Sequence, residues 1–260
     1  MSDHRQPDLA LARRFVEAHP PPGRVLLCTI TGSHHYGFPS PDSDLDIKGI
    51  HLAPTERLLG LAPSLGAHDR LLDFEGTECD LTTNEVGQSL SLLLGGNGNL
   101  LERVLSPFVV LTSPEHEVLR ELAQASLSRA SFRHYAGYFN GMCREHATRP
   151  EPRAKKMLYT FRVALTGVHL LKTGQLEADV TVNAPRYGFD QVLELVERKV
   201  ATAEQVVLTP DEDQRFRALW PSLEKMLQDA RDASPLPEQP PNREDIERWL
   251  IKLRRHELVD

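Results

Sequence analysis

The sequence is poor in the residues that cross-link small secreted folds, and it has no long apolar run. Its 260 residues include three cysteines, Cys28, Cys79 and Cys143, which lie far apart without the Cys-x-x-Cys spacing of a zinc knuckle. We therefore expect reduced, mostly buried thiols and no disulfide framework. No apolar stretch approaches the roughly 20 residues that cross a bilayer. A role in the membrane is therefore not expected.

The sequence also lacks an excess of positive charge. Its formal net charge of −7 argues against broad nonspecific binding of nucleic acid. A local basic face could still hold a phosphate-rich substrate, because the distribution of charge decides this and not the total. The first residues carry acidic side chains and a proline and lack the apolar core of a secretory signal, which predicts a cytoplasmic protein. The sequence leaves the oligomeric state open, with a monomer favoured.

Hydrophobic periodicity divides the chain near Ser113. The pattern before it is mixed, with an expected helix over 8–18, strands over 24–31, 44–52 and 77–82, and a helix over 84–94 followed by a second one. After it almost everything is typical of helix, over 114–130, 131–148, 152–173, 190–202, 211–231 and 242–257. We predict an α+β protein with a mixed-sheet domain over 1–112 and an α-helical domain over 113–260.

The segment from Thr31 to His51 concentrates the residues suited to chemistry. Gly32 directly follows a predicted buried strand and allows the backbone to approach a ligand, while Ser33 offers a hydroxyl and an N–H to phosphate. Asp44 and Asp46 share one face of the next predicted strand, because side chains alternate with period two. Two adjacent carboxylates need a cation, and their hard oxygens suit Mg²⁺ or Mn²⁺ better than zinc.

Two later segments carry further candidates. Glu78 and Asp80 share one face of the strand predicted over 77–82, and either could supply a third acidic ligand. On the helix predicted over 152–173, Lys155, Tyr159 and Arg162 follow one another at spacings of four and three, beside a separate apolar stripe. Such a stripe offers charges for phosphate and a ring for a base or ribose.

These pieces together resemble one known superfamily. The chain has Gly32-Ser33 and Tyr36-Gly37, then Ser43, Asp44, Asp46, Lys48 and Gly49, then Asp80, then Gly96, Asn97, Asn99 and Glu102, then Lys155, Tyr159 and Arg162. Their types and order resemble the DNA polymerase β nucleotidyltransferase superfamily, in particular a bacterial branch of predicted nucleotidyltransferases associated with RNA repair. The family pattern favours Asp80 over Glu78 as the third acid. It more often has His where Tyr159 stands, which weakens a proton-transfer role for that residue.

The resemblance implies a small mixed-sheet nucleotidyltransferase domain, followed by a helical domain that binds nucleotide or substrate. Two Mg²⁺ or Mn²⁺ ions would be held by Asp44, Asp46 and Asp80, the implied catalytic residues. Gly32 and Ser33 would cradle the phosphates of a nucleoside triphosphate, and Lys155, Tyr159 and Arg162 would bind the nucleotide. The implied reaction moves a nucleoside monophosphate from the triphosphate to an acceptor hydroxyl, at the 3′ end of a tRNA-like RNA.

Other interpretations stay open. A small member of the superfamily could instead attach AMP to a protein, as in toxin–antitoxin systems, and the acidic net charge keeps this alternative alive. A third possibility is a nucleotide-binding regulator without catalytic activity. Lys48 could pair with a carboxylate or contact a substrate phosphate, and Asn97, Asn99 and Glu102 could simply cap a helix. The choice of nucleotide, the acceptor and the number of nucleotides added are not fixed by the sequence.

Overall fold

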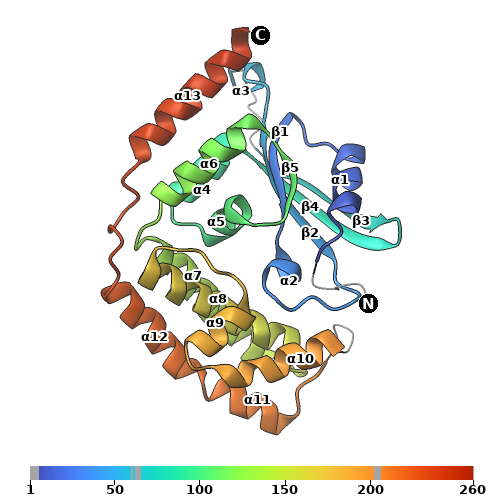
Figure 1. The fold of residues 1–260 in the computed structure, drawn as a ribbon, viewed down its shortest axis with the longest axis vertical. Helices are drawn as coiled ribbons and strands as arrows, with labels where there is room; N and C mark the ends of the chain where they lie inside the picture. The colour runs from blue at the N-terminus through green and yellow to red at the C-terminus, as the bar shows by residue number, and fades with distance from the viewer. Residues whose placement is uncertain (1–5, 60, 62–65, 202–205, 260) are drawn as a thin grey trace. The chain divides into compact units, whose positions relative to one another are not determined.

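The computed structural model describes residues 6–59, 61, 66–201 and 206–259 (Figure 1). Contacts within the chain define two compact units. The first, called the sheet unit, comprises Pro7–Gly32, Asp44–Leu127 and Gln239–Asp260. The second, called the helical unit, consists mainly of Ser33–Ser43 and Ser128–Glu238. This division differs from the predicted one after residue 112, because a short early segment belongs to the helical unit and the last helix to the sheet unit.

The sheet unit is built on one mixed sheet. Its strands are β1 (Arg24–Ile30), β2 (Leu45–Leu52), β3 (His68–Phe74), β4 (Thr77–Glu85) and β5 (Val109–Thr112), in the order β3-β4-β2-β1-β5. β2 pairs parallel with β4, and the other neighbours are antiparallel. The central β2 alternates buried and half-buried residues over its first half, as the sequence pattern predicts. The α+β fold class is thereby confirmed.

Helices cover both faces of this sheet (Figure 1). The amphipathic α1 (Leu9–Ala18) lies on one face, where Phe15 and Val16 join a buried cluster with Ile30 and Ile47. On the other face lie α4 (Val86–Leu94), α5 (Gly98–Leu105) and α6 (Pro114–Ala125). The unit also contains α3 (Glu56–Leu59) and α13 (Arg243–Val259). Side chains at even positions of β2, such as Asp46, therefore point to the face away from α1.

The helical unit is organised around α8 (Ala154–Thr173), whose second half is buried on every side. Its neighbours are α7 (Ser131–Thr148), α9 (Val180–Arg186), α10 (Leu193–Ala201), α11 (Pro210–Arg217) and α12 (Trp220–Asp232), with a 3-10 turn, η1, at Asp190–Val192. Leu158, Phe161, Leu165 and Val168 are fully buried, so the predicted apolar stripe is confirmed. Of the described helices, none is long and apolar enough to cross a membrane.

Several local predictions need correction. Strand β3 lies where we expected only a loop, and α9 was not predicted. The helix expected over 211–231 is two helices, α11 and α12. Asp44 comes immediately before β2 instead of inside it. The three cysteines are free thiols, with Cys28 and Cys79 buried, as predicted; burial raises the pKa of Cys28 to about 12.

Candidate functional site

The backbone at Gly32 lies directly against the carboxylate of Asp46. Gly32 has φ +63°, and a Cβ atom at this position would come within 1.7 Å of Asp46 Oδ2. The preceding Thr31 donates its N–H to the Asp46 carbonyl at 2.9 Å, which ties the end of β1 to β2. Glycine is thus needed at position 32 both for its backbone conformation and for this close approach.

The sheet register brings the acidic candidates of the sheet unit together. Asp46 of β2 lies opposite Asp80 of the parallel strand β4. Residues opposite each other in neighbouring strands point to the same face, so both carboxylates share one face with Lys48 and Thr82. Glu78 stands two residues before Asp80 and has its register partner in Asp73 of β3. The register therefore favours Asp80 over Glu78 as the companion of Asp46.

Lys48 forms an ion pair with Asp80. Its Nζ lies 2.6 Å from Asp80 Oδ2 and 3.3 Å from Thr82 Oγ1, and the lysine side chain is 19% exposed. Of the two interpretations of Lys48, pairing with a carboxylate is the one observed. This ammonium group reduces the repulsion between neighbouring carboxylates, which otherwise costs stability.

The donor chemistry fits a divalent ion, but the ligands are not gathered as a complete site. Carboxylate oxygens of Asp44, Asp46 and Asp80 are the hard donors that Mg²⁺ and Mn²⁺ prefer. Among the described residues, however, no group of three or more His, Cys, Asp or Glu side chains is arranged to hold a metal. Asp80 is engaged by Lys48. Lys48 occupies Asp80 Oδ2, and its contact at 2.6 Å leaves the other carboxylate oxygen, Oδ1, as the one that an ion would meet first.

In the helical unit, the segment Ser33–Ser43 lies against α8 and α9. The Arg162 guanidinium carbon stands 3.7 Å from the centroid of the Tyr36 ring, a close cation–π contact. Tyr159 meets the rings of Tyr36 and Phe38 edge-on, at centroid distances of 5.6 and 5.4 Å. Val180 donates its N–H to the Tyr36 carbonyl at 3.0 Å. The residues between the Gly-Ser turn and the aspartates are therefore fixed to helices far away in sequence.

The polar stripe predicted on α8, formed by Lys155, Tyr159 and Arg162, is buried or half-buried and does not form a solvent-exposed face. Arg162 is 5% exposed, Lys155 and Tyr159 are half-buried, and the stripe continues into the core at Thr166. Burial, and next the positive charge of Arg162, lowers the pKa of His35 and of His134 to about 4. Both histidines are therefore neutral at pH 7.

Two positioning residues escaped the sequence analysis. Lys199 of α10 is fully buried and donates from Nζ to Ser40 Oγ at 2.9 Å, with Ser43 Oγ 3.3 Å away. Asp179, the N-cap of α9, lies so close to Gly37 that a Cβ there would meet its Oδ1 at 1.9 Å. An Asp before an apolar helical pattern is a cap signal that could have indicated Asp179. Lys199 lies in a charged helix and carries no local signal.

The Gly96 to Glu102 segment starts α5 and supports β2. Asn97, instead of Asn99, caps the helix by accepting the Leu100 N–H at 3.2 Å. The next turn supplies Arg103, which is 6% exposed and donates to the Gly49 carbonyl of β2 at 2.8 Å and to Asn84 Oδ1 at 2.6 Å. Burial lowers the pKa of Arg103 to about 10, which leaves it charged at neutral pH. Part of this motif is therefore structural.

A mixed sheet with aspartates on neighbouring strands beside a Gly-Ser turn is typical of nucleotidyltransferases of the polymerase β class. The chain belongs to the RNA repair pathway DNA polymerase beta family, whose model matches residues 3–252. The resemblance predicted from the motifs is thereby confirmed. The description of this family refers to RNA repair and to DNA polymerase β.

Two curated relatives and one solved structure are similar to parts of the chain. The chain is 27% identical over 154 residues to the uncharacterized protein MJ0002 of Methanocaldococcus jannaschii, covering 59% of this chain and 63% of the relative. It is 28% identical over 160 residues to the uncharacterized protein YcgL of Bacillus subtilis, covering 59% and 58%. The matches thus span about three fifths of these curated relatives. A crystal structure of a nucleotidyltransferase-like protein from Exiguobacterium sibiricum is similar with a TM-score of 0.33 at 13% identity, covering 85% of this chain and 74% of that one.

Proposed function

We propose that the protein transfers a nucleoside monophosphate from a nucleoside triphosphate to an acceptor hydroxyl at the 3′ end of an RNA. The observation that carries the proposal is the contact of Gly32 with Asp46, with Asp80 in register on the neighbouring strand. It supports a site in which a phosphate held at the Gly-Ser turn lies beside a carboxylate pair. The RNA acceptor is supported by the family alone.

In this proposal each candidate has one task. Asp44, Asp46 and Asp80 would hold divalent ions, Mg²⁺ or Mn²⁺, which when bound neutralise the phosphate charge and make the acceptor hydroxyl a better nucleophile. Gly32 and Ser33 would donate backbone N–H groups to the triphosphate. Lys155 and Arg162 would balance its charge, and Tyr159 would contact the base or ribose. All eight assignments are proposals.

The reaction then needs no covalent intermediate with the protein. The acceptor oxygen forms a bond to the α-phosphorus, the bond between the α-phosphorus and the bridging oxygen breaks, and pyrophosphate leaves. The residues contribute by positioning and by charge, which supply most of the rate acceleration in phosphoryl-transfer enzymes. Attachment of AMP to a protein uses the same chemistry with a different acceptor, so the acceptor must be tested directly.

The test is a labelling assay with matched variants. The full chain is incubated with Mg²⁺ or Mn²⁺, each α-labelled nucleoside triphosphate and either tRNA or bulk protein. Label in RNA supports the proposal, label in protein supports AMP transfer to protein, and triphosphate binding without label supports a regulator.

Asp46→Ala is expected to reduce transfer by at least about a thousandfold, because it removes a proposed metal ligand. The matched control is Asp69→Ala, which changes an exposed aspartate on β3 of the same sheet and should transfer normally. Both variants should keep the wild-type unfolding midpoint. Substantial transfer by a folded Asp46→Ala protein would contradict the assignment of Asp46 as a metal ligand.

A further inference from the structure

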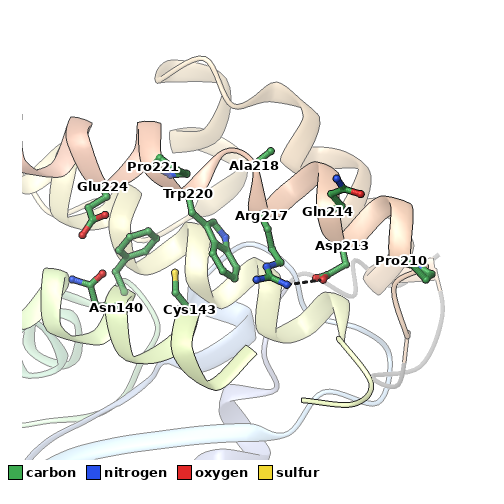
Figure 2. A pocket seen from close by; sticks show the side chains of 11 residues that line it. Asn140, Cys143, Pro210, Asp213, Gln214, Arg217, Ala218, Trp220, Pro221 and Glu224 are labelled. Atoms are coloured by element: carbon green, nitrogen blue, oxygen red, sulfur yellow. Dashed lines mark ion pairs between the residues drawn. The ribbon is translucent and has the colours of Figure 1, made fainter. Parts of the chain in front are cut away.

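A pocket of about 780 Å³ lies in the helical unit between α7, α11 and α12 (Figure 2). Its volume falls in the range of about 300–1,000 Å³ that is usual for small-molecule sites. Its walls come from α7 residues such as Phe139 and Cys143 and from residues at the ends of α11 and α12. No residue of the predicted transfer site lines it. The pocket therefore needs an explanation of its own.

One wall of the pocket is aromatic and rigid. Trp220 begins α12, and Figure 2 shows its indole pointing into the space between Cys143 and Arg217. The Arg217 guanidinium carbon stands 5.4 Å from the indole ring, and the His146 ring meets the indole edge-on at 5.7 Å. An aromatic wall of this kind offers a surface on which a flat base can stack. The shape thus favours a planar ligand.

Two buried ring nitrogens make no hydrogen bond within the described part of the chain: Trp220 Nε1, on a residue that lines the pocket, and His146 Nδ1, on a residue that contacts the indole but does not line the pocket. His146 Nε2 lies 2.6 Å from Asp213 Oδ1, and the imidazole side chain is 1% exposed. When the neutral ring donates from Nε2 to Asp213, Nδ1 is an acceptor, whereas Trp220 Nε1 is only a donor. Native proteins seldom leave such atoms unsatisfied. An acceptor on a ligand in the pocket would satisfy Trp220 Nε1.

The charges of the pocket disfavour phosphate. Asp213 is shared between His146 and Arg217, whose Nη1 lies 3.5 Å from Asp213 Oδ2, and Glu224 adds a second carboxylate at the wall (Figure 2). Burial raises the pKa of Cys143 to about 12, so its thiol stays neutral and is not a nucleophile. Asn140 adds an amide that can donate and accept. The arrangement suits an uncharged ring with donors and acceptors along its edges.

We propose that this pocket binds a purine nucleoside, with the base against Trp220 and its polar edges toward the amide and carboxylate side chains of the walls. A purine has ring acceptors and exocyclic or ring donors, and the pocket has ample room for its two fused rings. The nucleoside would be either free in solution or an unpaired residue of an RNA strand. Binding here does not require the proposed transfer reaction.

Trp220 provides the reporter for a direct test. The chain has two tryptophans, so Trp249→Phe leaves Trp220 as the sole indole. We would titrate this variant with adenosine, guanosine and uridine, in the absence of metal and triphosphate, and follow indole fluorescence. Stacking should give saturable quenching by at least one purine nucleoside with a Kd of about 1 mM or tighter, and uridine should bind at least about fivefold more weakly.

Matched variants separate the pocket from the rest of the surface. Asn140→Ala removes an amide of the wall and should weaken purine binding by about fivefold, the value of one hydrogen bond. Gln228→Ala changes an exposed amide of α12 that bonds only to Asp232 side-chain oxygens among the described contacts, and it should bind as the parent does. Asp46→Ala should also bind normally, because its change lies in the sheet unit.

The source of the nucleoside is resolved with a single-stranded purine hexaribonucleotide. Tighter binding of the hexamer than of the nucleoside identifies an RNA strand, and equal binding per base identifies the free nucleoside. Absence of saturable quenching up to about 10 mM of either purine nucleoside, or equal quenching by uridine, overturns the proposal. Either result leaves the labelling assay of the transfer reaction unaffected, so the two proposals fail separately.

Discussion

At the scale of single residues, Gly32 has little freedom to change. Its backbone has a positive φ, and the space where a Cβ would stand is filled by the Asp46 carboxylate. Gly76 shares the positive φ, at +84°, but nothing lies within 4 Å of its would-be Cβ. Substitutions at Gly32 and Gly76 therefore separate the energetic cost of the backbone conformation from the cost of displacing Asp46.

We expect Gly32→Ala to lower the free energy of unfolding by about 2–4 kcal/mol, since it adds a steric clash to the backbone strain. Gly76→Ala should cost about 1 kcal/mol through the backbone alone. Urea denaturation of both variants measures the difference. Labelling of RNA should be lost in Gly32→Ala and kept in Gly76→Ala. Equal destabilisation by the two changes would contradict the close contact with Asp46.

Lys48 shows how the acidic residues coexist before any ion binds. Its ammonium group sits 2.6 Å from Asp80, the register partner of Asp46. Two half-buried carboxylates on neighbouring strands repel each other, and the ammonium group of Lys48 reduces that repulsion. Half-buried pairs of this kind contribute little net stability, because screening and side-chain entropy offset the attraction. Its role is better understood as balancing charge at the proposed site.

At the scale of elements, the segment Ser33–Ser43 connects β1 to β2 yet belongs to the helical unit. Stacking of Tyr36 on Arg162 and the Lys199 bond to Ser40 hold it there. Lys199 is fully buried, and burial of an ammonium group is costly unless hydrogen bonds compensate it. The buried ammonium group of Lys199 is therefore consistent with a role in positioning the loop that precedes Asp44.

Lys199→Met tests that role. The substitution keeps most of the side-chain volume and removes the ammonium group, so we expect the free energy of unfolding to change by about 1 kcal/mol or less. Transfer should nevertheless fall about tenfold, with the loss in kcat, because the loop loses its tie to α10. The control is Lys172→Met, on exposed α8 surface. Wild-type kcat in a folded Lys199→Met protein would contradict the positioning role.

The elements also show what local sequence reveals and what it does not. β1 was predictable as a continuous apolar run of strand length, and the apolar stripe of α8 was predictable because burial on one side of a helix imposes a period on its residues. β3 was not, since this edge strand is exposed on most positions and its formation depends on pairing with β4. The paired aspartates were found through spacing, whereas Lys199 acts across 159 residues of sequence, which leaves no periodic trace.

At the scale of the whole molecule, the chain passes between its two units beside the predicted motifs. It leaves the sheet unit between Gly32 and Ser33 and returns between Ser43 and Asp44. The predicted boundary after residue 112 missed this exchange, because a change in periodicity marks where helices dominate and does not show which segments contact each other. The Gly-Ser pair and the Asp-x-Asp motif therefore each lie where the chain passes from one unit to the other.

Buried histidines make the stability of the molecule dependent on pH. Burial lowers the pKa of His35 and His134 to about 4, and it lowers the pKa of His51, His116 and His169 as well. Below pH 6.5 these side chains take up protons in the unfolded chain before they do so in the folded protein. The unfolded state then binds more protons, so the free energy of unfolding falls as the pH falls from 6.5 to 4.

We expect the free energy of unfolding to be nearly constant between about pH 7 and 8 and to fall steadily from pH 6.5 to 4.5, by at most on the order of 3 kcal/mol for each of His35 and His134 across their full windows. The hydrogen bond to Arg24 lowers the pKa of Glu115 to about 2. The stabilisation that such a carboxylate gives the protein is therefore lost mainly below pH 4.5, outside the range of the histidines. Urea denaturation at intervals of half a pH unit measures the slope of the free energy of unfolding against pH.

His134→Gln should reduce this slope, whereas His256→Gln, at an exposed position of α13, should leave the slope unchanged. Identical slopes for the wild type and His134→Gln would show that His134 is not held neutral in the folded protein.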